Sequence, residues 1–206
     1  MKIYDVYLFD FDGTLVDSAR SYHSVFRHGF DCVGIHDVSD EECEDFIHYS
    51  LSDTARLRGV KEEDIPLFIR GILESLDDPE VIAATTLFPD TLPMLSRLKG
   101  KRLGIVSGNT VKHIRLVNDF LNMPPLFEAF MGSDRYKKGK PDPEPISLCL
   151  KQMNLSPSAD IVYVGDSLND VKCGLAAGIE VVLIDRNGDY PDFKGPKISS
   201  LEELLS

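Results

Sequence analysis

The sequence predicts an α/β protein with a Rossmann-like parallel sheet that is interrupted near its start by an all-helical insertion. Helical patterns alternate with apolar runs through residues 88–206, and parallel neighbouring strands need such crossover connections. By contrast, residues 18–85 contain no convincing strand. The apolar, β-branched runs, which are typical of strands buried on both faces, lie at residues 3–9, 102–106, 161–164 and 181–184.

The core elements can be placed in order along the chain. The first strand, residues 3–9, ends abruptly at Asp10, and a weaker strand is expected at residues 128–131. Pro89 begins a core helix, and Gly100 stands where a C-cap is expected. The core therefore restarts just before residue 89.

The insertion reads as a group of helices that pack on one another. Amphipathic stretches at residues 41–57 and 61–76 predict this packing. A helical block that follows the first strand lies beside the carboxyl ends of the strands, where such sheets bind ligands. We therefore expect an α/β catalytic core of residues 1–17 and 86–206 and a helical cap of residues 18–85.

Composition narrows the class of partner. The 206 residues include 43% hydrophobic and 27% charged residues, which are near-average values for a globular protein. The formal net charge of −12 repels nucleic acids and anionic membranes, so neither is expected as a partner. No stretch reaches the length of a membrane span, and we expect a cytoplasmic protein with reduced, buried thiols. These thiols belong to Cys32, Cys43, Cys149 and Cys173.

Two acids follow the first strand directly. Asp10 and Asp12 are separated by one residue, and Gly13 allows a tight turn that brings both carboxylates near one ligand. Asp-Gly turns are also common without any function. However, two acids at the end of a buried strand are unfavourable unless a cation or a proton compensates them. We therefore interpret the pair as a functional site.

A second group of polar residues follows the strand at residues 102–106. Ser107, Gly108 and Asn109 precede an expected helix, and a hydroxyl with backbone N–H groups at a helix N-terminus can hold a phosphate. Lys140 lies in a loop that glycine and proline keep irregular, and its ammonium could offset a phosphate dianion. We expect all four residues to bind substrate, although each alone also suits a turn or a solvated loop.

A third group follows the strand at residues 161–164. Asp166 and Asp170 fall at the carboxyl edge of the sheet, and oxygen ligands at a phosphate site are those that Mg²⁺ prefers. Asp166 is the expected direct ligand, unless it only caps the next helix. One helical turn later, Asp170 suits a supporting contact to the metal site or a bond to Lys140.

Together these motifs resemble the haloacid dehalogenase-like hydrolase superfamily, and the likeness spans nearly the whole chain. Further residues are similar to its phosphoglycolate phosphatase-like branch, in which a helical cap follows the first motif. They are Leu87-Phe88-Pro89-Asp90 with Leu98-Lys99, and residues 170–178. The four superfamily motifs appear here as Asp10-Phe11-Asp12-Gly13-Thr14-Leu15-Val16-Asp17-Ser18, Ser107, Lys140-Pro141 and Gly165-Asp166-Ser167-Leu168-Asn169-Asp170.

The resemblance implies a mechanism. Asp10 would attack phosphorus and form an aspartyl-phosphate, while Asp12 would serve first as acid and then as base. Mg²⁺ would be held by Asp10, by the backbone carbonyl of Asp12 and by Asp166, with Ser107 and Lys140 on the transferred oxygens. The implied protein is a phosphatase of a small phosphorylated metabolite, such as phosphoglycolate or a sugar phosphate.

Two other readings stay open at this point. A phosphosugar mutase similar to β-phosphoglucomutase shares Asp12 and differs in how the cap protects the aspartyl-phosphate from water. A non-catalytic phosphate sensor or protein-binding module would keep the fold without turnover, although it has no need for both a nucleophile and an acid/base. Dehalogenation is disfavoured, because the dehalogenases lack an acid two residues after the nucleophile. The sequence does not indicate an oligomeric state.

Overall fold

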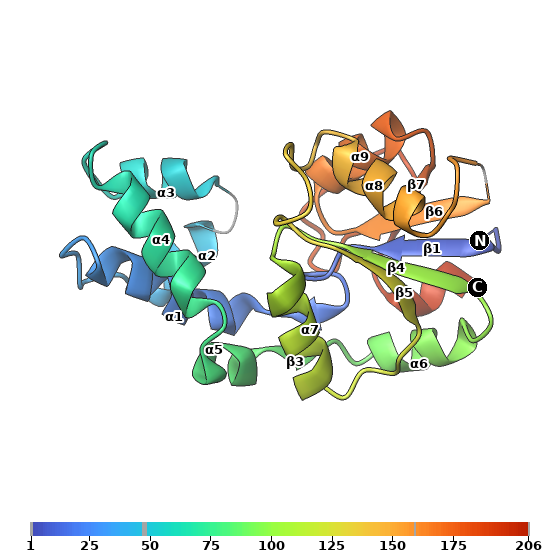
Figure 1. Cartoon of the computed structure of the whole chain (residues 1–206), viewed down its shortest axis with the longest axis horizontal. Coiled ribbons are helices and arrows are strands. Elements are labelled where there is room, and N and C mark those ends of the chain that lie inside the picture. Colours follow the sequence, from blue (N-terminus) through green and yellow to red (C-terminus); the bar gives the residue numbers. More distant parts are fainter. Residues whose placement is uncertain (1, 47–48, 159, 206) are drawn as a thin grey trace. The chain divides into compact units, whose positions relative to one another are not determined.

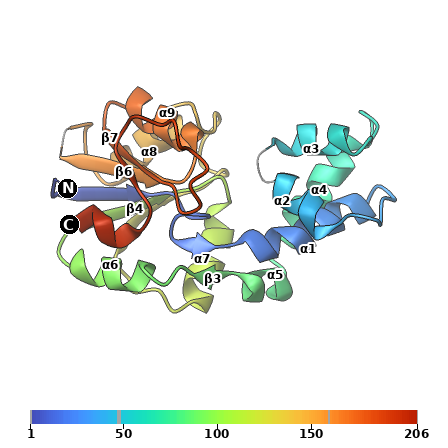
Figure 2. The ribbon, with the colours of Figure 1, turned by 180° about the vertical axis from the view of Figure 1, so that it is seen from behind.

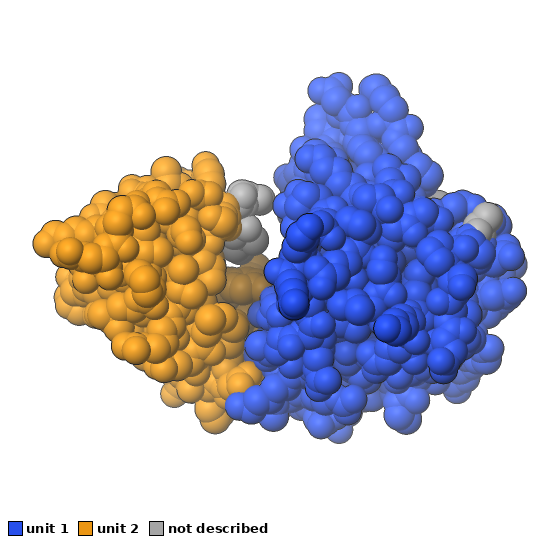
Figure 3. Space-filling model, turned by 45° about the horizontal axis from the view of Figure 1, so that its top comes forward, with its two compact units in different colours: residues 1–17, 87–206 blue, residues 18–86 orange. Residues whose placement is uncertain are grey.

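The computed structural model describes residues 2–46, 49–158 and 160–205. Contacts divide the chain into two compact units, Met1–Asp17 with Leu87–Ser206 and Ser18–Thr86, which Figure 3 colours separately. Within the described ranges, no helix combines the length and the apolar character needed to cross a bilayer.

The first unit contains a six-stranded sheet in the order β5-β4-β1-β6-β7-β8, and every pair of neighbours is parallel. This confirms the expected fold class. Strand β1 lies at the centre, with Phe9 paired to Ile105 of β4 and Val164 of β6, so the three strands end at the same edge. The strands are β1 Val6–Phe9, β4 Arg102–Val106, β5 Phe127–Met131, β6 Ile161–Gly165, β7 Glu180–Ile184 and β8 Lys197–Ile198.

Helices cover both faces of this sheet (Figure 1). Helices α8 and α9 lie on one face, whereas α6 and α7 lie on the other, as the reverse view also shows (Figure 2). Because side chains alternate along a strand, Leu8 and Tyr163 pack with Ile146 of α8 on one side. The helices are α6 Thr91–Arg97, α7 Val111–Phe120, α8 Glu144–Gln152 and α9 Leu168–Ala176, followed by the 3-10 helix η1 Leu201–Leu205.

The second unit is helical. Helices α1 and α4 approach closely, because a Cβ on Gly29 would lie 2.5 Å from Ile72 Cγ1. Rings of Phe30 and Phe68 meet beside this contact with centroids 4.6 Å apart. The stretch at residues 41–57 forms two helices, because Ser50 begins a new helix by accepting a hydrogen bond from Asp53 N at 3.1 Å. The helices are α1 Ala19–Asp31, α2 Asp40–Phe46, α3 Leu51–Leu57, α4 Ile65–Ser75 and α5 Pro79–Ala84.

Two short strands, β2 Val16–Asp17 and β3 Thr86–Leu87, pair where the chain leaves and re-enters the sheet unit. Nearby, the guanidinium of Arg186 donates to both carboxylate oxygens of Asp90 at 2.9 and 3.1 Å and to the carbonyl of Thr14 at 2.9 Å. It also stacks on the ring of Phe88, 3.7 Å from its centroid. Arg186 therefore ties the turn after β1 to the segment that follows β3.

The cysteines agree with the prediction in one respect and differ in another. All four are free thiols, and Cys43, Cys149 and Cys173 are buried as expected. Cys32 was expected to be buried and is exposed, because it lies just beyond the last turn of α1.

Candidate active site

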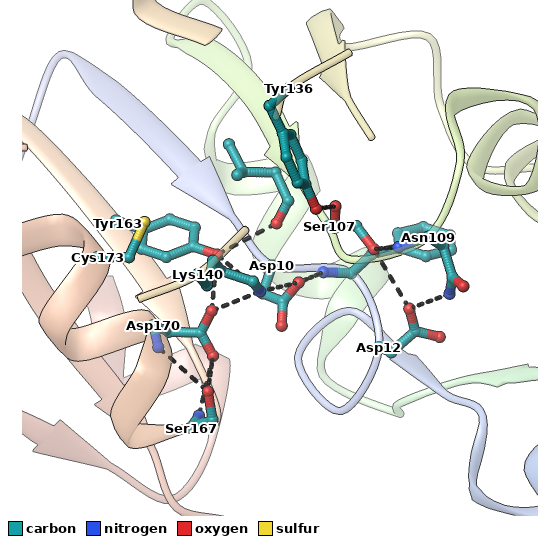
Figure 4. A network of polar contacts seen from close by, with 12 residues as sticks. Asp10, Asp12, Ser107, Asn109, Tyr136, Lys140, Tyr163, Ser167, Asp170 and Cys173 are labelled. Atoms are coloured by element: carbon teal, nitrogen blue, oxygen red, sulfur yellow. Dashed lines mark hydrogen bonds and ion pairs between the residues drawn. The ribbon is translucent and has the colours of Figure 1, made fainter. Parts of the chain in front are cut away.

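Asp10 lies directly after β1 and is only 7% exposed. Its Oδ1 accepts the Phe11 N–H at 2.8 Å and lies 3.0 Å from the ammonium of Lys140. Among the residues that the structure describes, none donates to Oδ2. Asp10 therefore has one oxygen held in place and one open for chemistry (Figure 4).

Asp12 lies on the opposite side of Asp10 from Lys140 in Figure 4. Its Oδ2 accepts the side-chain amide of Asn109 at 2.7 Å, and the hydroxyl of Ser107 is 3.5 Å away. The next residue, Gly13, has a φ of 72°, and a Cβ there would lie 2.1 Å from Asp166 Oδ2. The turn therefore requires glycine both for its backbone conformation and for the close approach of an acid.

Ser107, Gly108 and Asn109 follow β4, as predicted, and α7 begins behind them. Two amides of its first turn are already used, since Val111 N donates to Asp134 at 2.8 Å and His113 N donates to Thr110 Oγ1 at 3.2 Å. The N–H of Gly108 has no acceptor among the described residues, and a Cβ there would meet no atom. The N–H group that stays open for a ligand is therefore the one in the turn, at Gly108, and not those of Val111 and His113 in the first turn of α7. We call Ser107, Gly108 and Asn109 the cradle.

Lys140 and Asp170 form a buried ion pair. Lys140 Nζ lies 2.6 Å from Asp170 Oδ1, and the Asp170 side chain has no exposed surface. The other oxygen of Asp170 accepts the backbone N–H of Ser167 at 3.0 Å and also its hydroxyl. Ser167, and not Asp166, is the N-cap of α9, and Asp170 completes a capping box. The alternative of Asp166 as a helix cap is therefore wrong.

One carboxylate oxygen from each of Asp10, Asp166 and Asp170 lies within 4.8 Å of the others. Asp170 has donors at both oxygens, whereas Asp166 pairs with no cation and accepts no side-chain hydrogen bond within the described ranges. An acid left without a cation beside another buried acid fits a metal ligand of the oxygen-only kind that Mg²⁺ takes. The carboxylate oxygens that are free to bind a metal ion therefore belong to Asp10 and Asp166.

The three acids differ in the direction of their pKa shifts. Burial raises the pKa of Asp166 to about 7, with Asp170 adding to the effect. It also raises the pKa of Asp10 well above its usual range, although Lys140 opposes that shift. For Asp170, burial is outweighed by Lys140 and by hydrogen bonds from Ser167 and Tyr163, so its pKa is lowered. Lys140 supplies positive charge next to Asp10 and Asp170, whereas Asp166 pairs with no cation within the described ranges.

Three residues of this network were not predicted from the sequence as site residues. The Tyr163 hydroxyl touches Lys140 and Asp170, and the Tyr136 hydroxyl donates to the Ser107 carbonyl at 3.1 Å. Ser167 stands in the fourth motif, where no local feature indicates that it holds Asp170. A tyrosine in an apolar run looks like any core residue, so no local signal marked Tyr163.

The fold and the acidic cluster together are those of a haloacid dehalogenase-like hydrolase. This family matches residues 7–184, and the chain belongs to it. The acidic cluster is typical of the metal site of this family.

Individual relatives agree with this assignment. A phosphoglycolate phosphatase from Aquifex aeolicus (strain VF5) is 26% identical over 210 residues, which cover 97% of this chain and 96% of that protein. Hexitol phosphatase A from Escherichia coli (strain K12) is 32% identical over 191 residues, covering 90% and 85%. The crystal structure of a haloacid dehalogenase-like hydrolase from Bacteroides fragilis has a TM-score of 0.84 at 30% identity, covering 98% of this chain and 99% of that one.

These relatives confirm the family, its phosphoglycolate phosphatase-like branch and the enzyme class, which is a phosphatase. The roles of single residues, the identity of the ion, the substrate and the cellular compartment stay predictions.

Proposed function

We propose that this chain is a Mg²⁺-dependent phosphatase that hydrolyses a small phosphomonoester by way of a phosphoryl group on Asp10. The observation that carries the proposal is the carboxylate of Asp10, which is buried, held at one oxygen by Lys140 at 3.0 Å and open at the other. Orientation of this kind suits a nucleophile, since it removes the need to order the attacking group during reaction.

The first proposed step is phosphoryl transfer to the enzyme. An oxygen of Asp10 forms a bond to phosphorus while the bond from phosphorus to the substrate oxygen breaks. Asp12 in its acid form gives its proton to that leaving oxygen. The hydrogen bond from Asn109 to Asp12 at 2.7 Å supports this role, because it fixes the carboxyl group beside the reacting atoms.

Hydrolysis of the aspartyl-phosphate is the second step. Asp12, now ionised, takes a proton from water as the water oxygen bonds to phosphorus, and the bond from phosphorus to Asp10 breaks. Inorganic phosphate leaves and both acids return to their starting states. We propose that Ser107, Asn109 and the open N–H of Gly108 bind the transferred oxygens during both steps.

The metal requirement rests on the same residues. Asp10, Asp166 and the carbonyl of Asp12 would hold Mg²⁺, while Asp170 would position Lys140 beside it. When bound, Mg²⁺ shields the repulsion between a carboxylate and a phosphate dianion.

The substrate proposal is a small molecule with one phosphate ester. Relatives named for phosphoglycolate and for hexitols make 2-phosphoglycolate and sugar or hexitol phosphates the first compounds to test. We propose that residues 18–85 form a cap over the core, whose closure excludes water and bulky phosphoproteins. The segments near residues 17–18 and 83–88 would be its hinges.

The experiment is phosphate release from a panel of such compounds, with and without Mg²⁺, by the wild type and by Asp10→Asn. We expect Mg²⁺-dependent release by the wild type and at least about a thousandfold loss in the variant, because an amide cannot act as the nucleophile. Asp5→Asn, an exposed change, is the control and should keep full activity. An active Asp10→Asn enzyme would refute the mechanism; isomer formation without free phosphate would show a mutase, and tight phosphate binding without turnover would show a sensor.

A further inference from the structure

Tyr163 brings one hydroxyl to three segments of the site. It lies in β6, its side chain is fully buried, and its hydroxyl is 3.3 Å from Lys140 Nζ, 2.9 Å from Asp170 Oδ1 and 3.2 Å from the carbonyl of Val106. Val106 is the residue before Ser107, so this one atom lies between the end of β4, the first turn of α9 and the loop that carries the lysine. Figure 4 shows the phenol of Tyr163 beside Lys140.

The donors and acceptors around Lys140 balance. An ammonium has three N–H donors and no acceptor. Three oxygens lie around this one, Asp10 Oδ1 at 3.0 Å, Asp170 Oδ1 at 2.6 Å and the phenol oxygen at 3.3 Å. Within the described ranges, each N–H donor therefore has one acceptor, and the phenol supplies the third of them.

The phenol proton is also accounted for. A phenol donates one hydrogen bond and can accept others, and the proton of Tyr163 faces Asp170 or the Val106 carbonyl. When it points to Asp170, ammonium, phenol and carboxylate form a closed triangle, because Lys140 contacts both other members. Such a triangle restricts the ammonium to one place, whereas a single ion pair would leave the flexible lysine stem free to turn.

We propose that Tyr163 is a positioning residue for phosphoryl transfer, because its hydroxyl holds the ammonium of Lys140 against Asp10. This inference rests on the proposed function of Asp10 as nucleophile. Without the hydroxyl, one N–H of a buried ammonium has no acceptor, and Lys140 shifts toward Asp170, which is its shorter contact. Asp10 then reacts from a less defined position, so turnover falls while substrate binding changes little.

Tyr7 provides a matched control. It lies in β1 next to β6, is also fully buried, and its hydroxyl accepts the Tyr4 N–H at 3.0 Å. Leu8 is the residue paired with Tyr163, so Tyr7 points to the opposite face of the sheet. Tyr7→Phe removes a buried hydroxyl that does not touch the site, and it measures the structural cost alone.

The experiment is a double-mutant cycle with p-nitrophenyl phosphate and Mg²⁺. We expect Tyr163→Phe to lower kcat about tenfold with KM within about twofold, and Tyr7→Phe to leave both within about twofold. In a Lys140→Met background, Tyr163→Phe should change kcat less than about twofold, because the group through which it acts is gone. The melting temperatures of Tyr163→Phe and Tyr7→Phe show whether both variants fold.

Two results would overturn the proposal. One is a Tyr163→Phe enzyme as active as Tyr7→Phe, and the other is an equal loss of kcat with and without Lys140. If the wild type turns over no compound, the proposed function fails separately, and the same four proteins of the cycle are compared by calorimetric binding of inorganic phosphate in Mg²⁺. Coupling of Tyr163 to Lys140 in phosphate affinity then supports the positioning role, and independent effects contradict it.

Discussion

Replacing Asp170 by Asn tests the buried charge network from its most enclosed member. The substitution is nearly isosteric and removes one negative charge. At present one oxygen faces Lys140 and Tyr163, and the other faces two donors of Ser167. An amide has only one oxygen, so whichever way the new side chain turns, its NH₂ group faces donors. The variant loses the charge that pairs with Lys140 in either orientation. Its one oxygen can face either Lys140 and Tyr163 or the Ser167 donors that complete the capping box of α9, but not both.

The expected cost follows from the surroundings of the pair. Removing one partner of a buried ion pair costs about 3–5 kcal/mol. Two features place Asp170→Asn at the lower end: Asp10 remains 3.0 Å from Lys140, and the repulsion that Asp170 exerts on Asp10 and Asp166 disappears. We expect a loss of about 3 kcal/mol, which for a chain of this size lowers Tm by about 6–12 °C.

Differential scanning calorimetry without Mg²⁺ measures this shift. Asp5→Asn is the control, since Asp5 also pairs with a lysine, Lys101, but its side chain is 79% exposed. Exposed pairs contribute at most about 1 kcal/mol, so the control should move Tm by less than about 4 °C. Equal small shifts for both variants would show that the buried network contributes no more than a surface pair, and the reasoning would be refuted.

Two further predictions concern pH and the turn after β1. Because burial raises the pKa of Asp166 from 3.8 to about 7, its contribution to stability is complete below pH 3.8 and is lost as pH rises through 7. Calorimetry should therefore show Mg²⁺ raising Tm more at pH 8 than at pH 5.5, and Asp166→Asn should remove this difference; equal stabilisation at both pH values would contradict it. For Arg186→Lys, we expect a loss of about 2 kcal/mol in urea unfolding, because an ammonium cannot pair with Asp90 through two bonds, reach the Thr14 carbonyl and stack on a ring at once. Arg102→Lys at a more exposed pair should cost under about 1 kcal/mol, and an equal cost at both positions would exclude a special role for Arg186.

The sheet and the positions of the acids followed from the sequence for a physical reason. Buried parallel strands are continuous apolar runs, and their carboxyl ends meet at one edge, so Asp10, Ser107 and Asp166 could be expected at that edge. The order of the strands, which makes β4 and β6 the neighbours of β1, came only with the structure. The break between α2 and α3 was harder to see. It depends on Ser50 starting a new helix inside a stretch whose apolar period continues through it.

The supporting contacts could not be predicted, because they join residues whose local sequence is ordinary. Arg186 and Asp90 are 96 positions apart, and the Tyr163 hydroxyl reaches Lys140, 23 positions away, and Val106, 57 positions away. Apolar periodicity explains why Tyr163 is buried, but it does not indicate which groups the hydroxyl contacts. Such contacts can be identified only when the order and the register of the strands are known.

The charges of the site favour the metal dependence that we propose. The site holds four carboxylates, those of Asp10, Asp12, Asp166 and Asp170, and the one ammonium that the described residues place among them, Lys140, pairs only with Asp10 and Asp170. The three donors of that ammonium already have acceptors in Asp10, Asp170 and Tyr163. A phosphate dianion would add two negative charges, and the described residues of this cluster offer no second side-chain cation, so we expect backbone N–H groups and a divalent ion to meet its charge. Phosphate affinity should therefore depend on Mg²⁺ more steeply than on any single side chain of the cradle.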